Sequence, residues 1–407
     1  MNIDLFEIYK NNIEEFKYIE ANINKNGLIL FGAGFYGIQC LNYMIDNGYN
    51  IKYIIDNDKN KYGNKLKNNI EILQQNDNKL KDSKIVIVTP VFLSSKEQIE
   101  SLKIYESKLI HFNKWFTLKN FDKYLEIIDI CKDKRSKEVL TILVYYYLTG
   151  DSRYNCFTYD DNQYFAIPQF KFSSLSEVFL NAGACTGDTV ERFIEHHLAM
   201  IEHIYAFEPG DKQYNAMKKR IERVKMEWSI DNDRIDLIKA GLSNKNKKGY
   251  FNKHTNNVAL NYISEEGVKD DEVQLYSIDD FLKNKNITFL AADVEGSEID
   301  MLKGAINTIK RCKPKMAISA YHKPDDLFKI INLIKSIVPE YEFSIRSHTT
   351  YFGDMVLYCW TDQTRPDQTR PDQTRPDQTR IICKEYILIY NNTKYKKLQP
   401  MLNNVTA

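Results

Sequence analysis

Two turns in the second half of the chain have residues suited to holding a cofactor. The first follows an apolar segment and reads NAGACTGDT from Asn181, so that Gly183 and Gly187 fall within one turn. Glycine allows a backbone to turn sharply and to approach a ligand closely. The turn lacks the lysine of a phosphate-binding P-loop, which argues against a nucleoside triphosphate. A capping box formed by Asp188 and Glu191 is the structural alternative for the same residues.

The second turn contains Glu208, in the sequence AFEP, and lies 21 residues after Gly187. An acid at the end of the second strand of a dinucleotide-binding fold accepts hydrogen bonds from the ribose hydroxyls of its ligand. Taken alone, Glu208 is better interpreted as an exposed loop acid. Together, the glycine turn and the acid predict a site for a ligand that contains a ribose.

Two further clusters carry groups that can accept a proton. DVEGSE begins at Asp293, YHKPDD contains His322, and each cluster follows an apolar segment. Because the carboxyl ends of parallel strands meet at one edge of a sheet, we expect the clusters to lie together. His322 beside an acid is then a candidate general base. Two alternatives stay open: Asp293 is the base, or it holds a divalent cation that acidifies the acceptor. In a purely structural interpretation these residues only stabilise helix starts.

A third glycine-rich turn, FGAGFYG, lies near the N-terminus and includes Gly32, Gly34 and Gly37. Asp56 follows Gly37 by 19 residues, which suits a dinucleotide fold. These four residues are a candidate nucleotide-binding site. No Tyr-x-x-x-Lys box follows, so a nucleotide-binding or structural role is favoured over NAD-dependent catalysis.

Strands that alternate with helices must position these clusters. In the first part of the chain the apolar segments are 27–31, 51–55 and 85–88, and residues 120–150 have helical spacing. In the second part the segments are 178–181, 203–207, 235–240, 288–292, 315–320, 342–346 and 354–359. This order predicts parallel α/β sheets. The last two segments have no helix between them and are expected to pair as an antiparallel hairpin.

Composition and charge narrow the class of protein. The chain has 407 residues, of which 43% are hydrophobic, and 56 basic and 55 acidic residues give a net charge of +1. This balance argues against nucleic-acid or anionic-membrane partners. The longest apolar stretch, 139–148, is too short to span a bilayer, and the N-terminus does not resemble a secretory signal. Seven scattered cysteines without a CxxC pair predict free thiols, no zinc site and a cytoplasmic location.

The stretch from about 177 to 360 resembles the FkbM-type methyltransferases. The matching pieces, in order, are NAGACTGDT, AFEP, DVEGSE followed by MLKGA, YHKPDDL and the closing MVLYC. The resemblance implies a class I methyltransferase fold with a reversed final hairpin. It also implies S-adenosylmethionine as methyl donor and an oxygen acceptor, often on a sugar or a natural product.

Carried over position by position, the resemblance implies a set of site residues. Glu208 would hold the ribose, Ala240 and its neighbours would flank the adenine, and Asp293 and His322 would face the transferring methyl. The methionine end of the donor would meet the glycine turn, at Asn181, Gly183, Ala184, Gly187 and Asp188.

Two positions depart from the family pattern. The family usually has Asp where this chain has Asn181, and often has Lys where this chain has Ala291. Asn181 can still form hydrogen bonds. The change at Ala291 removes any contribution of a lysine to the site.

The N-terminal segment resembles the small Rossmann-like domains that precede some bacterial sugar-modifying enzymes. The expected architecture is therefore a class I methyltransferase sheet, a smaller N-terminal Rossmann-like domain and a helical connector. The expected divisions are a Rossmann-like domain at 1–115, the connector at 116–170, the methyltransferase domain at 171–361, a DQTRP tandem-repeat linker at 362–380 and a tail at 381–407.

The expected function is methyl transfer from S-adenosylmethionine to a hydroxyl of a sugar or glycan precursor, such as a nucleotide sugar for surface polysaccharide. The partner is then a small molecule or nucleotide sugar. Two alternatives use the N-terminal motif. One is an NAD-dependent sugar-modifying redox enzyme, and the other is a non-catalytic nucleotide-binding protein.

The repeat gives a first testable prediction. Residues 362–380 contain four DQTR units separated by prolines, and each unit has one acid, one base and no apolar residue. Such a segment cannot bury enough surface to offset its ordering entropy, so we expect a solvated linker. Shortening it to one unit should leave the melting temperature and methyl transfer unchanged. A fall of more than about 3 °C would mean that the repeat packs against the fold.

Overall fold

The computed structural model describes residues 3–75, 77–80, 85–89, 108–171, 176–252, 262–264 and 271–361. Residues Asp4–Pro366 group into one compact unit. The repeat linker and the C-terminal tail expected from the sequence lie outside the described residues. Within the described part of the chain, no helix combines the length and apolarity needed to cross a bilayer.

The first sheet has five parallel strands in the order β3-β2-β1-β4-β5. They are β1 (Leu28–Phe31), β2 (Ile51–Ile55), β3 (Ile72–Leu73), β4 (Ile85–Val88) and β5 (Lys108–His111). The three apolar segments predicted as strands here are confirmed. Every residue of β1 and β4 is buried, which explains why both read as unbroken apolar runs. Helix α2 (Phe35–Asp46) follows β1 directly, as the glycine turn predicts.

A long N-terminal helix, α1 (Leu5–Asn26), is a feature that the sequence analysis missed. The Asp4 carboxylate caps it by accepting hydrogen bonds from the backbone N–H groups of Phe6 and Glu7. Its buried residues are Leu5, Phe16, Ile19 and Ile23. The apolar face is narrow, so the helix carries little of the periodic signal on which a prediction depends.

Three helices join the two sheets along the chain: α4 (Phe112–Lys119), α5 (Phe121–Ile130) and α6 (Lys134–Thr149). They confirm the helical spacing predicted for residues 120–150. Helix α6 packs against α1, α4 and α5 and also against strand β15 (Glu342–Ser347) of the second sheet. Phe328 lies against Phe116 and Tyr124, with ring centroids 5.9 and 5.0 Å apart.

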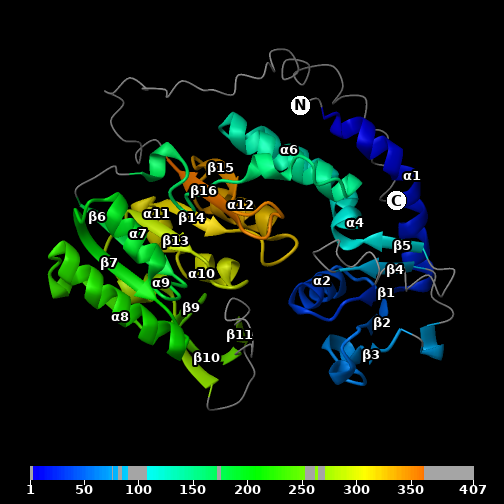
Figure 1. Ribbon diagram of the computed structural model, residues 1–407, viewed down its shortest axis with the longest axis horizontal. Helices are drawn as coiled ribbons and strands as arrows, with labels where there is room; N and C mark the ends of the chain where they lie inside the picture. Colours follow the sequence, from blue (N-terminus) through cyan, green and yellow to red (C-terminus); the bar gives the residue numbers. More distant parts are fainter. Residues whose placement is uncertain are drawn as a thin grey trace. The chain divides into compact units, whose positions relative to one another are not determined.

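The second sheet has seven strands in the order β15-β16-β14-β13-β6-β7-β8 (Figure 1). Besides β15 they are β6 (Glu177–Ala182), β7 (Ile201–Phe207), β8 (Ile235–Ile238), β13 (Phe289–Ala292), β14 (Lys315–Ser319) and β16 (Met355–Trp360). Only β16 runs antiparallel to its neighbours, β14 and β15. All seven predicted strands and the final hairpin are therefore confirmed, and the sheet has the class I methyltransferase order.

Helices connect most of these strands. They are α7 (Asp188–His196), α8 (Asp211–Trp228), α9 (Ile278–Leu282), α10 (Glu298–Lys303), α11 (Ile306–Cys312) and α12 (Asp326–Ile337). Short 3-10 turns occur at Lys59–Lys61, Lys67–Asn69, Asn78–Leu80, Asn155–Thr158, Pro168–Phe170 and Asn232–Arg234.

A third, four-stranded sheet was not expected from the sequence. Its order is β11-β10-β12-β9, from β9 (Gly241–Leu242), β10 (Lys247–Asn252), β11 (Tyr262–Ser264) and β12 (Glu272–Tyr276). These strands are short and largely polar, so they give neither a buried apolar run nor a clean alternation. The sheet follows β8 in the chain, directly after Ala240.

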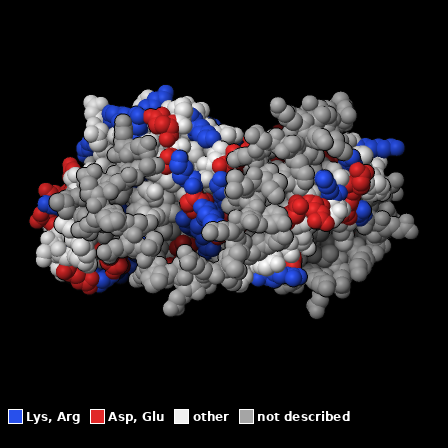
Figure 2. Space-filling view, turned by 90° about the horizontal axis from the view of Figure 1, so that it is seen from above, with Lys and Arg blue, Asp and Glu red and all other residues white. Residues whose placement is uncertain are grey.

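Charges of both signs share the surface. On the face seen in Figure 2, basic and acidic side chains lie beside one another among the described residues. Ion pairs such as Lys248–Glu272 at 2.7 Å and Lys79–Glu71 at 2.7 Å are examples of this mixing. The mixture agrees with the nearly neutral net charge.

One ion pair of the second sheet is fully buried. The Lys315 ammonium lies 2.7 Å from the Glu177 carboxylate, and both side chains are at most 3% exposed. Burial lowers the pKa of Lys315, while Glu177 acts to raise it. Lys315 also lies over the ring of Phe289, 5.5 Å from the centroid. The pair joins the first residues of β6 and β14, which flank β13.

This pair gives a second prediction. Lys315→Met should lower the free energy of unfolding by about 3–5 kcal/mol, because it leaves a carboxylate buried without its cation. Adding Glu177→Leu removes that carboxylate and should restore most of the loss. Urea denaturation measures both effects. A double variant as unstable as the single one would mean that lost packing, and not the unpaired charge, causes the loss.

Candidate active site

The glycine turn connects β6 to α7 at the carboxyl edge of the sheet. The backbone N–H groups of Gly183 and Ala184 both donate to the carbonyl of Phe207, at 3.1 and 2.8 Å. Gly183 and Gly187 have φ values of +76° and +81°, which side chains disfavour. Asn181 is buried, and its Oδ1 has no hydrogen-bond partner among the described residues. An acceptor oxygen is therefore held beside the turn without a donor.

The capping box considered for this turn is wrong. Gly187 is the N-cap residue of α7, no side chain caps the helix, and Asp188 is its first helical residue. Glu191 instead pairs with two arginines of α8: Arg220 at 2.6 Å, and Arg223. Two guanidinium groups from the neighbouring helix outcompete the single backbone N–H that a capping box would offer.

Glu208 lies beside the turn, at the end of β7. Its two carboxylate oxygens accept hydrogen bonds from the backbone N–H of Cys185 at 2.9 Å and of Gly210 at 2.7 Å. The residue is only 6% exposed. Burial raises the pKa of Glu208 to about 7, although the two N–H groups oppose that rise. The carboxylate is thus held in place beside the glycine turn, and its contact with a ribose stays a prediction.

Ala240 follows β8, which pairs with β7. It is buried, and its backbone N–H donates to the carbonyl of Ile238 at 3.0 Å. The ends of β6, β7 and β8 therefore place the glycine turn, Glu208 and Ala240 in sequence along one sheet edge. Their contact with a cofactor stays a prediction.

Asp293 and His322 meet, as the sequence analysis expected. Asp293 follows β13 and His322 follows β14, and these two strands are parallel neighbours. The Nε2 of His322 lies 3.2 Å from Asp293 Oδ1. A Cβ built on Gly183 would lie 1.8 Å from the carbonyl oxygen of Asp293, so the glycine turn also touches this end of β13.

Three carboxylates surround the His322 ring, where the sequence analysis expected one. Besides Asp293, Glu295 Oε2 lies 3.3 Å from Nε2 and Glu298 Oε1 lies 3.0 Å from Nδ1. Burial acts to lower the pKa of His322, but these carboxylates outweigh it and hold the pKa well above its usual value. An imidazole that is already protonated cannot accept a proton, so this geometry disfavours His322 as the free general base. Its 2% exposed side chain is also out of reach of an acceptor.

Asp293 is the more accessible member of the pair. Its side chain is 25% exposed, and Oδ2 accepts a hydrogen bond from the Tyr164 hydroxyl at 3.2 Å. Burial acts to raise the pKa of Asp293, but His322 and Tyr164 bring it below the usual value. Asp293 is therefore ionised and within reach of a substrate.

Sequence reasoning missed the contribution of the segment before β6. Gln163 donates to both carboxylate oxygens of Asp354, at 2.9 and 3.1 Å, and the next residue, Tyr164, binds Asp293. Tyr164 has a φ of +68°, which is unusual for a residue other than glycine. Burial raises the pKa of Asp354 to about 7. The sequence around Gln163 and Tyr164 contains no recognised motif, so it gave no signal of this role.

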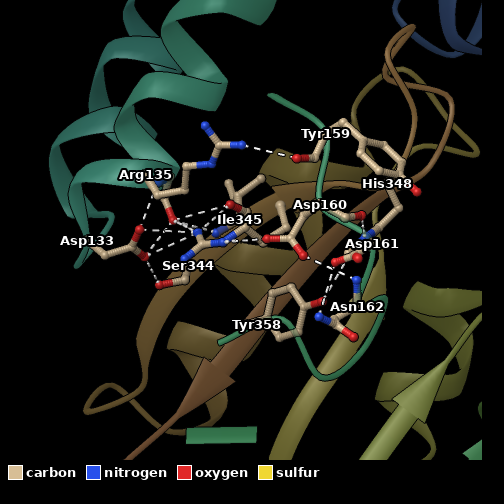
Figure 3. A network of polar contacts seen from close by, with 12 residues as sticks. Asp133, Arg135, Tyr159, Asp160, Asp161, Asn162, Ser344, Ile345, His348 and Tyr358 are labelled. Carbon is tan, nitrogen blue, oxygen red and sulfur yellow. Dashed lines mark hydrogen bonds and ion pairs between the residues drawn. The ribbon is translucent and has the colours of Figure 1, made fainter. Parts of the chain in front are cut away.

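A polar network fixes that segment against the hairpin β15–β16 (Figure 3). The His348 ring bridges the Asp160 carbonyl, 2.7 Å from Nδ1, and the Tyr358 hydroxyl, 3.1 Å from Nε2. The same hydroxyl accepts a hydrogen bond from the backbone N–H of Tyr164 at 3.0 Å. Asp133, at the start of α6, binds Ser344 of β15. Tyr164 is thus tied to the sheet through backbone and side chain.

The N-terminal glycine turn also has an acid beside it, Asp56, but one oxygen of this acid is bound by a lysine as well as by the backbone. One oxygen of Asp56 accepts from the Ala33 backbone N–H at 2.6 Å and from Lys61 Nζ at 3.1 Å. A Cβ on Gly37 would lie 2.0 Å from the Gly32 carbonyl oxygen, which explains that glycine by close packing. Gly34 has open space around it. Nucleotide binding at this turn stays a prediction.

Among the described residues, two groups of side chains have the proximity needed to hold a metal ion. They are Asp293, Glu295 and His322, and Glu298, His322 and Asp326. From the sequence no zinc site was expected, and a divalent cation held by Asp293 stayed open as an alternative.

Comparison with known proteins gives a family match for one part of the chain and a solved structure of similar fold. Residues 181–358 match the family described as the methyltransferase FkbM domain. A methyltransferase FkbM from Methylobacillus flagellatus KT is similar over 88% of this chain and 98% of its own, with 20% identity and a TM-score of 0.56. A putative rRNA methylase from Clostridium thermocellum covers 47% of this chain and 89% of its own, with 9% identity and a TM-score of 0.31. No curated protein matches the chain.

The position of Glu208 gives a third prediction. Because the pKa of Glu208 is about 7, the ionised fraction of its side chain should fall about tenfold between pH 8 and pH 6. Affinity for S-adenosylhomocysteine should fall with it, because only the carboxylate can accept hydrogen bonds from both ribose hydroxyls. Calorimetry across this range measures the effect. Glu208→Gln should bind about tenfold to a hundredfold more weakly at pH 8 and lose the pH dependence. Glu295, whose charge also raises the pKa of Glu208, remains in both proteins. Equal pH dependence in the two would exclude Glu208 as its source.

Proposed function

We propose that this chain, an S-adenosylmethionine-dependent methyltransferase with an FkbM domain at residues 181–358, methylates a hydroxyl oxygen of a sugar or glycan precursor. The observation that carries the proposal is the contact between the glycine turn and Asp293. Gly183 approaches the Asp293 backbone so closely that no side chain fits between them. A donor held by the turn therefore has its reacting end beside an ionised carboxylate.

Different residues along the sheet edge bind different parts of the donor. Glu208 accepts hydrogen bonds from the ribose, in exchange for those it now receives from the backbone of Cys185 and Gly210. The glycine turn, from Gly183 to Asp188, and the Asn181 oxygen hold the methionine end. No side chain caps the start of α7, so its first backbone N–H groups favour the carboxylate of the donor, and Asn181 Oδ1 suits the ammonium group. Ala240 flanks the adenine.

S-adenosylmethionine, when bound, supplies a methyl group on a positively charged sulfur. Asp293 contacts the acceptor hydroxyl and takes its proton as the new C–O bond forms. Tyr164 and His322 hold the Asp293 carboxylate in place from two sides. Holding the hydroxyl in line with the methyl group supplies much of the rate enhancement.

The chemistry of the open side of the site favours a polyhydroxylated acceptor. Asp293, Glu295 and Asp354 all present carboxylate oxygens, which only accept hydrogen bonds when ionised. Sugar hydroxyls donate such bonds, and neighbouring hydroxyls can meet two acceptors at once. In a nucleotide sugar, the diphosphate would have to point away from these acids. The NAD-dependent redox alternative lacks comparable support, because Asp56 is engaged by Ala33 and Lys61.

The proposal gives a fourth prediction. Asp293→Asn keeps the shape of the side chain but removes the proton acceptor, and should lower kcat by about 10²–10⁴. Affinity for S-adenosylhomocysteine should change less than about threefold. Transfer of labelled methyl groups to a panel of nucleotide sugars and free glycans measures turnover. Asp300→Asn, on the exposed side of α10, is the matched control and should keep full activity. Unchanged turnover in Asp293→Asn would exclude it as the base, and transfer to nitrogen acceptors alone would exclude the hydroxyl.

A further inference from the structure

The ligand atoms around His322 Nε2 converge on a common point. Asp293 Oδ1 lies 3.2 Å from Nε2, Glu295 Oε2 lies 3.3 Å from it, and all three atoms are within 4.8 Å of one another. The two carboxylates come from the loop after β13 and the imidazole from the loop after β14. Backbone pairing of the two strands therefore fixes the three side chains relative to one another.

These groups are buried but lack hydrogen bonds. His322 is 3% exposed, and neither of its ring nitrogens makes a hydrogen bond with good geometry. Asp293 Oδ1 is likewise buried without a hydrogen-bond donor. The carboxylate oxygens lie close enough to the ring but off the line of its N–H bonds. Buried polar atoms nearly always have a bonding partner. His322 Nε2 and Asp293 Oδ1 are therefore expected to bind a group that is held between them.

A metal ion that displaces the Nε2 proton accounts for this arrangement, because metal binding releases protons from its ligands. Two ligands at a right angle, each about 2.1 Å from an ion, are about 3.0 Å apart, close to the separations seen here. In that geometry each oxygen flanks the nitrogen's axis instead of lying on it. One N–H bond, in contrast, can point to only one oxygen, and here it points to neither.

The surroundings of the three ligand residues fit the same interpretation. Glu298 Oε1 lies 3.0 Å from the other ring nitrogen, Nδ1, and is itself held by the backbone N–H of Val294 at 3.1 Å. A carboxylate on the far nitrogen commonly orients a metal-binding histidine. Asp326 adds a fourth acid, whereas the nearby Lys323 ammonium binds the Gly296 carbonyl. Four acids thus surround one imidazole in a buried place, and a cation would stabilise their ionised forms.

We propose that Asp293, Glu295 and His322 form a binding site for a first-row divalent cation, of which Mn²⁺ is the probe. One imidazole and two carboxylates suit such an ion better than Mg²⁺ or Ca²⁺, which prefer all-oxygen sites. Three protein ligands leave positions open for water or a substrate oxygen.

This inference rests on the proposed function and adds a second means of activating the hydroxyl. A hydroxyl bound to the cation becomes more acidic. Its proton passes to the second oxygen of Asp293, Oδ2, which accepts the hydrogen bond from Tyr164. The acceptor oxygen then bonds to the methyl carbon, the sulfur–methyl bond breaks, and the sulfur keeps the electron pair as a neutral thioether.

The test uses the full chain, freed of metal by a chelator, and S-adenosylhomocysteine binding is measured on the same protein. Calorimetry with MnCl₂ should give one strong site per chain, and MgCl₂ should bind at least about tenfold more weakly. Asp293→Asn and Glu295→Gln should each weaken Mn²⁺ binding about tenfold to a hundredfold. Asp354→Asn is the matched control. It removes a carboxylate that interacts with Asp293 but is outside the ligand set, and should change Mn²⁺ affinity less than about threefold.

Electron paramagnetic resonance identifies the histidine. Bound Mn²⁺ should show magnetic coupling to a ring nitrogen, and His322→Gln should abolish that coupling. If this variant does not fold, loss of affinity in Glu295→Gln still decides the matter. Equal weakening in Asp354→Asn, or absence of the coupling in the wild-type protein, would overturn the site. If the wild type binds S-adenosylhomocysteine but not Mn²⁺, the cation site fails alone. If neither ligand binds, the proposed function fails as well.

Discussion

A single backbone contact holds the two sides of the site together. The turn at Gly183 lies against the carbonyl of Asp293, with a φ of +76° and no room for a Cβ. The Asp293 N–H donates to the carbonyl of Ala182 at 2.9 Å, which fixes the same contact from the strand side. The cofactor turn after β6 and the acids after β13 are therefore one unit. Any side chain at residue 183 would separate the donor from the group that meets the acceptor.

The second constraint is electrostatic. At the carboxyl edge of β13 and β14, three carboxylates surround the single imidazole of His322, so negative groups outnumber the positive one. Several of these side chains are buried or partly buried. Such an arrangement costs free energy unless positive charge completes it. The sulfonium of the donor provides one such charge, and the proposed cation provides another. The acids thus connect the binding of both ligands to the stability of this edge of the sheet.

Much of the fold could be predicted from the sequence because the central strands are buried on both faces. β13 is apolar from end to end, β14 is buried throughout with an apolar centre at residues 316–318, and the chemistry-bearing residues follow each strand within three positions. Strand pairing alone therefore brings Asp293 and His322 together. The sheet β9–β12 could not be predicted in the same way, because its short polar strands depend on pairing with one another and carry no periodic signal.

The parts of the site that could not be predicted depend on contacts between distant segments. Tyr164 reaches Asp293 from 129 positions away, and nothing in its local sequence indicates it. The pairing of Glu191 with Arg220 crosses between two helices and overrides a local capping pattern. The charge on His322 results from three acids whose convergence only the fold determines. Local patterns identify which residues can do chemistry, whereas the fold determines their protonation and partners.

The central claim is that the donor binds along the ends of β6, β7 and β8 with its sulfur facing Asp293. A crystal structure of the full chain with S-adenosylhomocysteine tests this most directly. The account predicts both ribose hydroxyls within hydrogen-bond distance of Glu208, and the sulfur on the side of the ligand nearest Asp293 and His322. Ligand bound at the N-terminal turn around Gly34, or bound at Glu208 with its sulfur turned away from Asp293, would contradict the account.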